Sequence, residues 1–354
     1  MVRARVIIVG AGPIGLELAA SLKRAEVAYL QFDAGQIGET FTRWPRDTRF
    51  FSTPERIAIA GYPIQTREQG RITGEEYLAY LRAVVEHADL QVHTYENVTR
   101  IARIARGFSV TTSRKDQPLQ YESEIVVLAN GDMHEPHRLA IPGEDLPHVS
   151  HYFRDPHSYF QQRVLIVGGR NAALEAALRC FRIGAHVTIS YRRSAFNKDF
   201  VKPHLIDDVR AQIKAGNIQF LPSTTPTKIE PAHVELARAA EPGNRQRLRH
   251  ETDFVLLCTG YDADQRLMAE AGVEFSNEDR VPLHDAETME TNVPGLYVAG
   301  TAAAGHQKRY AVFIENSHLQ VGKIVQALTG EWPTALGTIL TRLYDLTFED
   351  YKRN

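Results

Sequence analysis

The sequence predicts an α/β protein made of two Rossmann-like halves, because a strand, a glycine-rich turn and a helix occur in it twice. In the first copy the apolar run 5–9 is followed by GAGPIG at 10–15, and in the second an apolar run precedes GGRNAA at 168–173. Continuous β-branched runs suit parallel strands that are buried on both faces. One such turn is a weak signal, but two copies about half a chain apart predict two bound dinucleotides and electron transfer between them.

The order of the segments predicts that the second half is inserted into the first. A proline-containing crossover at 135–156 precedes the second copy, and a strand ending near Tyr261 closes it. We therefore expect a discontinuous first domain, residues 1–134 and 263–354, and a second domain, residues 155–262. Helical patterns are expected at 74–88, 200–216 and 311–328, and strand patterns at 28–33, 91–101, 107–113, 124–131, 218–222, 227–230, 233–236 and 253–261.

Composition excludes several classes of function. The formal net charge of −2 gives no global attraction to nucleic acid or to an anionic membrane, and no apolar stretch approaches the roughly 20 residues of a membrane span. The two cysteines, Cys180 and Cys258, form no CxxC and suit buried core positions, so neither a disulfide framework nor a metal site is expected. Because the first strand begins almost at Met1, we expect no signal peptide and a cytoplasmic protein.

The first glycine turn has the pattern that holds a dinucleotide without a 2′-phosphate. Gly10 allows the tight turn, Gly12 lets the backbone approach a pyrophosphate, and Gly15 lets helix and strand pack closely. The helix that follows offers unpaired N–H groups and a partial positive charge to the phosphates. Asp33, at the end of the next strand, can accept hydrogen bonds from ribose hydroxyls and would repel a 2′-phosphate. The alternative is a structural turn followed by a solvated carboxylate.

The second turn differs in a way that favours NADPH over NADH. Arg170 occupies the middle-glycine position, and Arg192 and Arg193 follow the next strand where an acidic residue would otherwise stand. Guanidinium groups suit the dianionic 2′-phosphate of NADP, and Lys198 could assist them. The alternative is a solvated basic loop.

Other polar residues lie near candidate turns without a unique role. His306 and Tyr310 follow the run VAGTAAAG, so they could bind substrate or flavin, or belong to an exposed polar loop. The turns ANG at 129–131 and CTGY at 258–261 each follow an apolar strand and could contact the dinucleotides or be plain turns.

These motifs resemble the thioredoxin-reductase-like flavoproteins over nearly the whole chain. The resemblance is carried by GAGPIG, Asp33, GGRNAALEAA with its two arginines, CTGY and ETNVPGLYVAG. More narrowly, RFFSTPERIAI, HYFRDPHSYF and VFIENSHLQVGKIV are similar to the YpdA-type bacillithiol disulfide reductases. The resemblance implies FAD in the outer domain, NADPH in the inserted domain, and a homodimer.

Matching positions imply the residues of each site, and Trp44, Phe50 and Phe51 would lie toward the isoalloxazine. No catalytic residue is assigned, and the candidates near the flavin are Ile14, Phe51, His306 and Tyr310. FAD would be lined by Gly10, Gly12, Pro13, Ile14, Gly15, Asp33, Trp44, Phe50, Asn130, Gly131, Gly300, Thr301, Phe313 and Ile314. NADPH would be lined by Gly169, Arg170, Asn171, Ala172, Glu175, Arg192, Arg193, Lys198 and Gly260.

The chain departs from the resembling families at points that matter for chemistry. It lacks the CxxC of thioredoxin reductases, and Ile14 stands where YpdA-like proteins often carry a cysteine. Thr301 stands where wider relatives place an aspartate against the ribityl chain. We predict an FAD-dependent reductase that oxidises NADPH and reduces a small acceptor, such as a low-molecular-weight thiol disulfide. The alternatives are a ferredoxin- or flavodoxin-NADP reductase, which needs no cysteine, and a non-catalytic NADPH-binding redox sensor.

Overall fold

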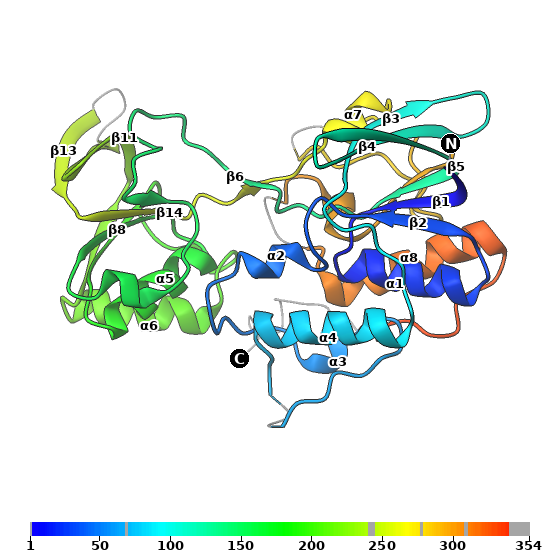
Figure 1. Ribbon diagram of the computed structural model, residues 1–354. Helices are drawn as coiled ribbons and strands as arrows, with labels where there is room; N and C mark the ends of the chain where they lie inside the picture. The colour runs from blue at the N-terminus through cyan, green and yellow to red at the C-terminus, as the bar shows by residue number, and fades with distance from the viewer. Residues whose placement is uncertain (1, 68–69, 240–244, 277–278, 308–310, 340–354) are drawn as a thin grey trace. The chain divides into compact units, whose positions relative to one another are not determined.

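The computed structural model describes residues 2–67, 70–239, 245–276, 279–307 and 311–339, and its contacts divide the chain into two compact units (Figure 1). In these ranges the first unit consists of residues 2–43, 47–135 and 262–339, and the second of 44–46 and 136–261. Each unit contains a parallel sheet with helices against it, which confirms the predicted α/β class. The crossover 136–154 groups with the second unit.

The first unit is built on a sheet whose central strands are parallel. Its order is β2-β1-β5-β4-β3, and β16 pairs with β5. The last residues of β5 lie between β1 and β16, because Leu128 is in register with both Val9 and Val298. β3, β4 and the first half of β5 form an antiparallel meander. The strands are β1 (Val2–Val9), β2 (Tyr29–Phe32), β3 (Asn97–Arg103), β4 (Phe108–Arg114), β5 (Gln117–Leu128) and β16 (Leu296–Val298).

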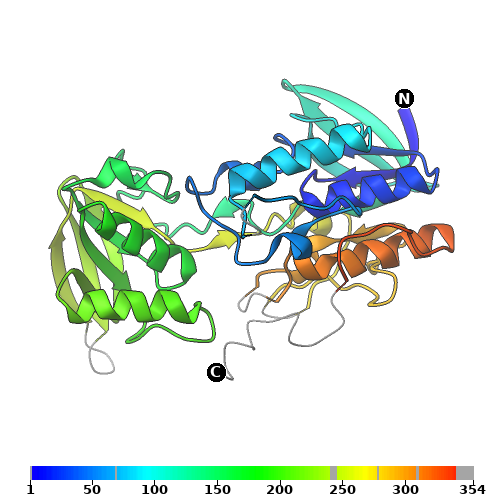
Figure 2. The ribbon, with the colours of Figure 1, turned by 90° about the horizontal axis from the view of Figure 1, so that it is seen from below.

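Helices α1 and α8 lie side by side against this sheet, as Figures 1 and 2 both show. The predicted helix at 74–88 is α4, which begins with a capping box between Thr73 and Glu76. The strand expected at 91–101 begins only at Asn97, because Tyr95 has a left-handed backbone (φ 55°) that an extended strand does not tolerate. The helices are α1 (Pro13–Arg24), α2 (Glu39–Thr42), α3 (Pro54–Ile57), α4 (Gly74–His87), α7 (Arg266–Glu270), α8 (Ile314–Thr329) and the 3₁₀ helix η2 (Gly300–Ala304).

The second unit has a five-stranded parallel sheet in the order β10-β9-β8-β14-β7. Strand β8 is buried on both faces, as its apolar run predicts. The strands are β7 (Val149–Ser150), β8 (Arg163–Val167), β9 (His186–Tyr191), β10 (Ile218–Pro222) and β14 (Phe254–Leu257). The helices are α5 (Asn171–Arg182), α6 (Pro203–Lys214) and the 3₁₀ helix η1 (Pro156–Tyr159), and the chain crosses between the units at the paired strands β6 (Glu135–Pro136) and β15 (Tyr261–Asp262).

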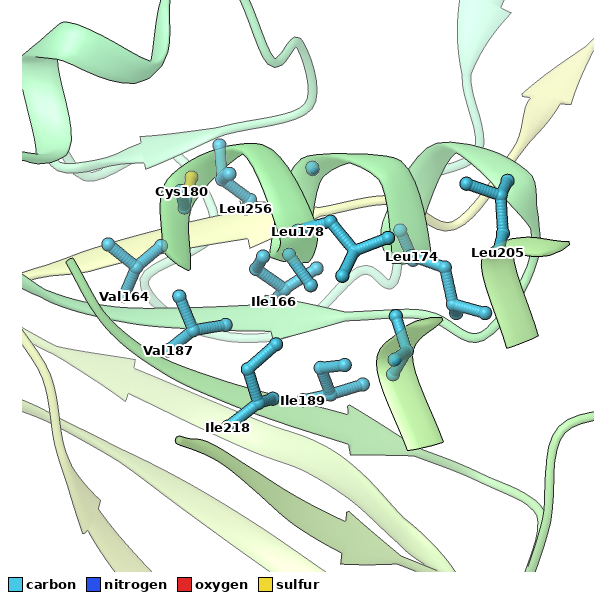
Figure 3. Close-up of a cluster of buried hydrophobic side chains, with 14 of the residues drawn as sticks. Val164, Ile166, Leu174, Leu178, Cys180, Val187, Ile189, Leu205, Ile218 and Leu256 are labelled. Atoms are coloured by element: carbon cyan, nitrogen blue, oxygen red, sulfur yellow. The ribbon is translucent and has the colours of Figure 1, made fainter. Parts of the chain in front are cut away.

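Alternate residues of β8 contribute to two different cores. Val164 and Ile166 pack with α5 and α6 (Figure 3), whereas Leu165 and Val167 pack against a three-stranded meander. That meander consists of β11 (Thr224–Glu230), β12 (His233–Ala239) and β13 (Arg245–Glu251). The sequence pattern predicts the first two strands but not β13, because the residues RQRLRHE are almost all polar.

None of the helices in the described ranges is long and apolar enough to cross a membrane.

A buried ion pair joins the two helices beneath the first sheet. Glu17 of α1 and His318 of α8 are both fully buried, and Glu17 Oε2 lies 2.7 Å from His318 Nδ1. The other ring nitrogen, Nε2, faces the Arg56 carbonyl at 3.1 Å. Nδ1 faces a carboxyl group and Nε2 faces a carbonyl oxygen, so the imidazolium, which donates from both nitrogens, suits this site. Glu17 Oε1 also accepts the N–H groups of Ala60 and Gly337. This carboxylate therefore joins α1, α8 and the segments that contain Ala60 and Gly337.

This pair should make stability depend on pH. Burial opposes the charge of His318, but the hydrogen bond and charge of Glu17 outweigh it and raise the pKa of the ring above its ordinary value. The stabilisation is therefore complete below the unfolded value of about 6.5 and is lost as the pH rises through the higher folded value. We expect the urea midpoint of the wild type to fall over this range and that of His318→Gln to fall less. Parallel pH profiles of the two proteins would contradict this assignment.

Candidate dinucleotide-binding sites

The first glycine turn lies where β1 ends, and two of its glycines are required by the backbone around them. Gly10 has φ of +110°, and a Cβ there would lie 2.4 Å from the carbonyl oxygen of Ala129. A Cβ at Gly15 would lie 2.2 Å from the carbonyl oxygen of Gly10. No side chain fits at either position without displacing backbone, so these glycines fix the close approach of turn, strand and helix.

Gly12 has a different environment. A Cβ added there meets no atom of the described residues within 4 Å, and the φ of −72° is open to any residue. Gly12 is also the N-cap of α1, which starts with Pro13 and has no side-chain cap. The first N–H groups of α1 therefore remain available to an anion in the space in front of Gly12. This cradle fits the pyrophosphate of a dinucleotide.

Asp33 closes the turn from the β2 side. One carboxylate oxygen accepts the Ala11 N–H at 2.6 Å and the other accepts the Gly35 N–H at 2.8 Å. Burial raises the pKa of Asp33, and these two hydrogen bonds partly oppose the increase. A carboxylate has about four acceptor positions, so Asp33 retains capacity for ribose hydroxyls.

The ends of β5 and β16 supply the neighbouring turns of the predicted FAD site. The Ala299 N–H donates to the Leu128 carbonyl at 2.9 Å, which sets the two strand ends side by side. Asn130 donates to the Asp264 carbonyl, while its buried amide oxygen has no hydrogen-bond partner among the described residues. Ile14 is buried and packs on Gly300. A Cβ added at Gly300 would lie 3.4 Å from the Cβ of Ile14. Phe313 is the N-cap of α8, and its N–H donates to Asn316.

The three aromatic residues that the resemblance groups near a flavin have different surroundings. Phe50 is buried against Phe41 and Tyr77, with ring centroids 5.5 and 4.7 Å away. Phe51 is exposed. Trp44 is part of the second unit.

Among the other candidates near the flavin, His306 is half-buried in the first unit. The backbone N–H of His306 donates to the Asp279 carbonyl at 2.7 Å. Tyr310 lies outside the described residues.

The second glycine turn has the same close contact with a carbonyl oxygen as the first turn, but its next glycine lies against a side chain instead of open space. Gly168 has φ of +148°, and a Cβ there would lie 2.6 Å from the Cys258 carbonyl oxygen. A Cβ at Gly169 would lie 2.5 Å from the ring of Tyr191, which ends β9. Helix α5 begins after Arg170 without a side-chain cap, so its N–H groups too are available to a phosphate.

A cationic cluster lies beside this turn. The guanidinium carbons of Arg170 and Arg193 lie 5.1 and 5.8 Å from the ring centroid of Phe200. Asn171 Oδ1 accepts the Lys202 N–H at 2.9 Å, which ties the basic loop to the start of α5. Arg193 is exposed, and so are its neighbours Arg192 and Lys198. We name Phe200 and the two arginines that flank it the Phe200 cluster.

Sequence reasoning missed Phe200. The available signal was an aromatic residue between Lys198 and Lys202 in a loop that already contained two arginines.

The other residues predicted to line NADPH have varied surroundings. Gly260 has φ of +101° with open space in front of it. The carboxylate of Glu175 lies 3.9 Å from the Arg179 guanidinium, and burial raises the pKa of Glu175. The exposed Ala172 is in the first turn of α5.

Neither cysteine is suited to nucleophilic chemistry. Burial raises the pKa of both Cys180 and Cys258 to about 12, so both are thiols at neutral pH. No group of three or more potential metal ligands occurs in the described part of the chain.

Comparison with known proteins decides the family. The model of the pyridine nucleotide-disulphide oxidoreductases matches residues 7–300. The chain belongs to this family. Bacilliredoxin reductase Bdr of Bacillus subtilis (strain 168) is 31% identical over 326 residues, which cover 92% of this chain and 97% of that protein. The structure of the bacillithiol disulfide reductase Bdr (YpdA) from Bacillus cereus has a TM-score of 0.87 at 29% identity, covering 93% of this chain and 99% of the other.

A ferredoxin–NADP reductase of Ignicoccus hospitalis is 24% identical over 83% of this chain and 88% of that protein. Both the predicted family and the two-domain dinucleotide fold are thus confirmed. As a pyridine nucleotide-disulphide oxidoreductase, the chain is a flavoprotein reductase that uses FAD and NADPH.

Substitutions at Gly12 and Gly10 should have different consequences. Gly12→Ala places a methyl group in the open cradle, so we expect a folded protein that retains at most about a tenth of the wild-type FAD. The stability cost at an N-cap is only about 1 kcal/mol or less. Gly10→Ala should fail to fold, because its Cβ meets backbone at an unfavourable φ. Flavin absorbance and circular dichroism measure the two effects, and normal FAD content in Gly12→Ala would contradict the cradle.

Removing one cation of the Phe200 cluster should affect NADPH selectively. In Arg193→Ala we expect the KM for NADPH to rise about tenfold or more, because a charge-assisted hydrogen bond to a phosphate is lost, with the KM for NADH unchanged. Arg182→Ala is a matched control, since Arg182 is an exposed arginine at the end of α5 that pairs with Asp208. Equal effects on both nucleotides would exclude a 2′-phosphate contact.

Proposed function

We propose that the first unit holds FAD, the second holds NADPH, and the electrons reduce the disulfide of a low-molecular-weight thiol such as bacillithiol disulfide. The observation that supports this acceptor is the likeness, along nearly the full length of both chains, to the bacillithiol disulfide reductase Bdr (YpdA) from Bacillus cereus. When bound, FAD accepts hydride from NADPH and passes the electron pair on. We also propose a homodimer that acts in the cytoplasm, as the family resemblance implies.

The proposed reaction consumes one NADPH and one proton per disulfide. The S–S bond breaks, NADP⁺ forms, and two thiols are released. This chain contributes no reactive thiol among its described residues, because Ile14 occupies the first turn, Cys180 is buried, and burial raises the pKa of the half-buried Cys258 to about 12. We therefore propose that reduction involves no mixed disulfide with the protein.

A ferredoxin- or flavodoxin-NADP reductase is the second candidate. The observation that favours it is the same Ile14, since transfer to an iron–sulfur or flavin protein requires no thiol in the reductase. Relatives named ferredoxin–NADP reductase share about a quarter of their residues with this chain.

Anaerobic stopped-flow spectroscopy separates these proposals. The purified flavoprotein is reduced with one equivalent of NADPH and then mixed with bacillithiol disulfide, oxidised ferredoxin, oxidised flavodoxin or a quinone. We expect bacillithiol disulfide to restore flavin absorbance fastest. The double variant Cys180→Ala/Cys258→Ala should react within about twofold of the wild type, because neither thiol forms a thiolate at neutral pH.

Fastest reoxidation by ferredoxin or flavodoxin would replace the disulfide with a protein acceptor. A loss of more than about a hundredfold in the folded cysteine-free variant would contradict the thiol-independent route. Failure of NADPH to bleach the bound flavin would contradict both proposals.

A further inference from the structure

The strand order of the first unit determines the direction in which a bound FAD must run. Across the parallel part of the sheet the order is β2, β1, β5 and β16, and all four strands end at the same edge. Asp33 follows β2 and the glycine cradle follows β1. FAD consists of adenosine, pyrophosphate, ribityl chain and ring system, in that order. With the adenosine at Asp33 and the pyrophosphate at Gly12, the ribityl chain reaches the ends of β5 and β16.

A carboxylate that belongs to none of the predicted motifs lies at these two strand ends. Asp132 is half-buried in the turn after β5, and its Oδ2 accepts the side-chain N–H of Gln307 at 3.0 Å. The hydroxyl of Thr301, which follows β16, also donates to this carboxylate. Burial raises the pKa of Asp132, and the hydrogen bonds from Thr301 and Gln307 oppose the increase. We name Asp132, Thr301 and Gln307 the Asp132 cluster.

The side chain of Gln307 ties the Asp132 cluster to the backbone at Ala311 and Val312. Gln307 Oε1 accepts the N–H groups of Ala311 and Val312, each at 2.9 Å, and its Nε2 also donates to the Val312 carbonyl. A Cβ at Gly131 would lie 3.7 Å from Thr301 Oγ1, so the two turns are in contact. The carboxylate is therefore fixed between two turns, each of which contains residues predicted to line FAD.

The turn after β5 presents two acceptors and needs donors. The Asp132 carboxylate has acceptor capacity beyond its bonds to Thr301 and Gln307, and the buried amide oxygen of Asn130 has no partner among the described residues. The ribityl chain is the hydroxyl-rich part of FAD, and its O–H groups are donors. We propose that Asp132, positioned by Thr301 and Gln307, binds the ribityl hydroxyls of FAD and places a negative charge beside the flavin. This inference rests on the proposed location of FAD in the first unit.

The test compares three variants by FAD affinity and by the midpoint potential of the bound flavin. Asp132→Asn should bind FAD about tenfold more weakly, because hydrogen bonds to a charged acceptor are the stronger ones. Its potential should become more positive, since a charge that opposes electron uptake has been removed. Thr301→Val should weaken FAD binding less, because the carboxylate remains but loses one positioning bond. Glu135→Gln is the control, since it removes an exposed charge three residues away and should change neither quantity.

Affinities are measured by titrating apoprotein with FAD, and potentials by equilibration with dyes, after circular dichroism has shown that each apoprotein is folded. If folded Asp132→Asn keeps wild-type affinity and potential, Asp132 only joins two loops, and the inference is overturned while FAD in the first unit stands. A lower melting temperature of the variants without a change in either quantity overturns the inference in the same way. If the wild-type protein binds no FAD, the proposed function fails as well.

Discussion

In both units the fold depends on a turn glycine whose Cα lies directly against the carbonyl that follows the neighbouring strand. A Cβ would lie 2.4 Å from the Ala129 oxygen at Gly10 and 2.6 Å from the Cys258 oxygen at Gly168. Both glycines have a positive φ, so both steric fit and backbone conformation exclude side chains. This contact brings a strand end, a helix N-terminus and the next turn together, and the phosphate-binding features predicted for both units surround it.

The two turns differ in what occupies the position after this contact. In the first turn Gly12 faces open space, so bare backbone and uncapped N–H groups of α1 remain available. In the second turn Gly169 lies against the ring of Tyr191, and Arg170 follows it as the N-cap of α5. The first turn thus relies on backbone dipoles, whereas the second adds guanidinium charge. That difference matches one dinucleotide without a 2′-phosphate and one with it.

The features that the sequence predicts well are those with a local physical cause. Gly10 and Gly168 are recognisable because no other residue tolerates their backbone, and β8 because both of its faces are buried. The pattern could not reveal β13, since this strand is mostly polar and is specified by pairing with β12. The sequence pattern also could not show that Phe50 is buried, against Phe41 and Tyr77, while the adjacent Phe51 is exposed. Phe200 and Asp132 were missed because the features that single them out are tertiary contacts. Phe200 contacts Arg170 and Arg193. Asp132 contacts Thr301 and Gln307, which are about 170 residues away in the sequence. Neither residue belongs to a spaced motif by which a single sequence could select it.

Ile14 connects the fold to the chemistry. Its side chain, in the first turn of α1, is buried against Gly300, so the position where the resemblance implies a cysteine serves packing here. Burial also holds Cys180 and Cys258 as thiols, with pKa values of about 12. Under the proposed function the electron pair therefore passes directly between the cofactor and the acceptor, because the described part of the chain offers no reactive thiol. A site that works in this way selects its acceptor by access and electrostatics rather than by thiol exchange. In the proposed binding of FAD, the charged and polar groups at the ends of β5 and β16 then have a direct influence on the flavin.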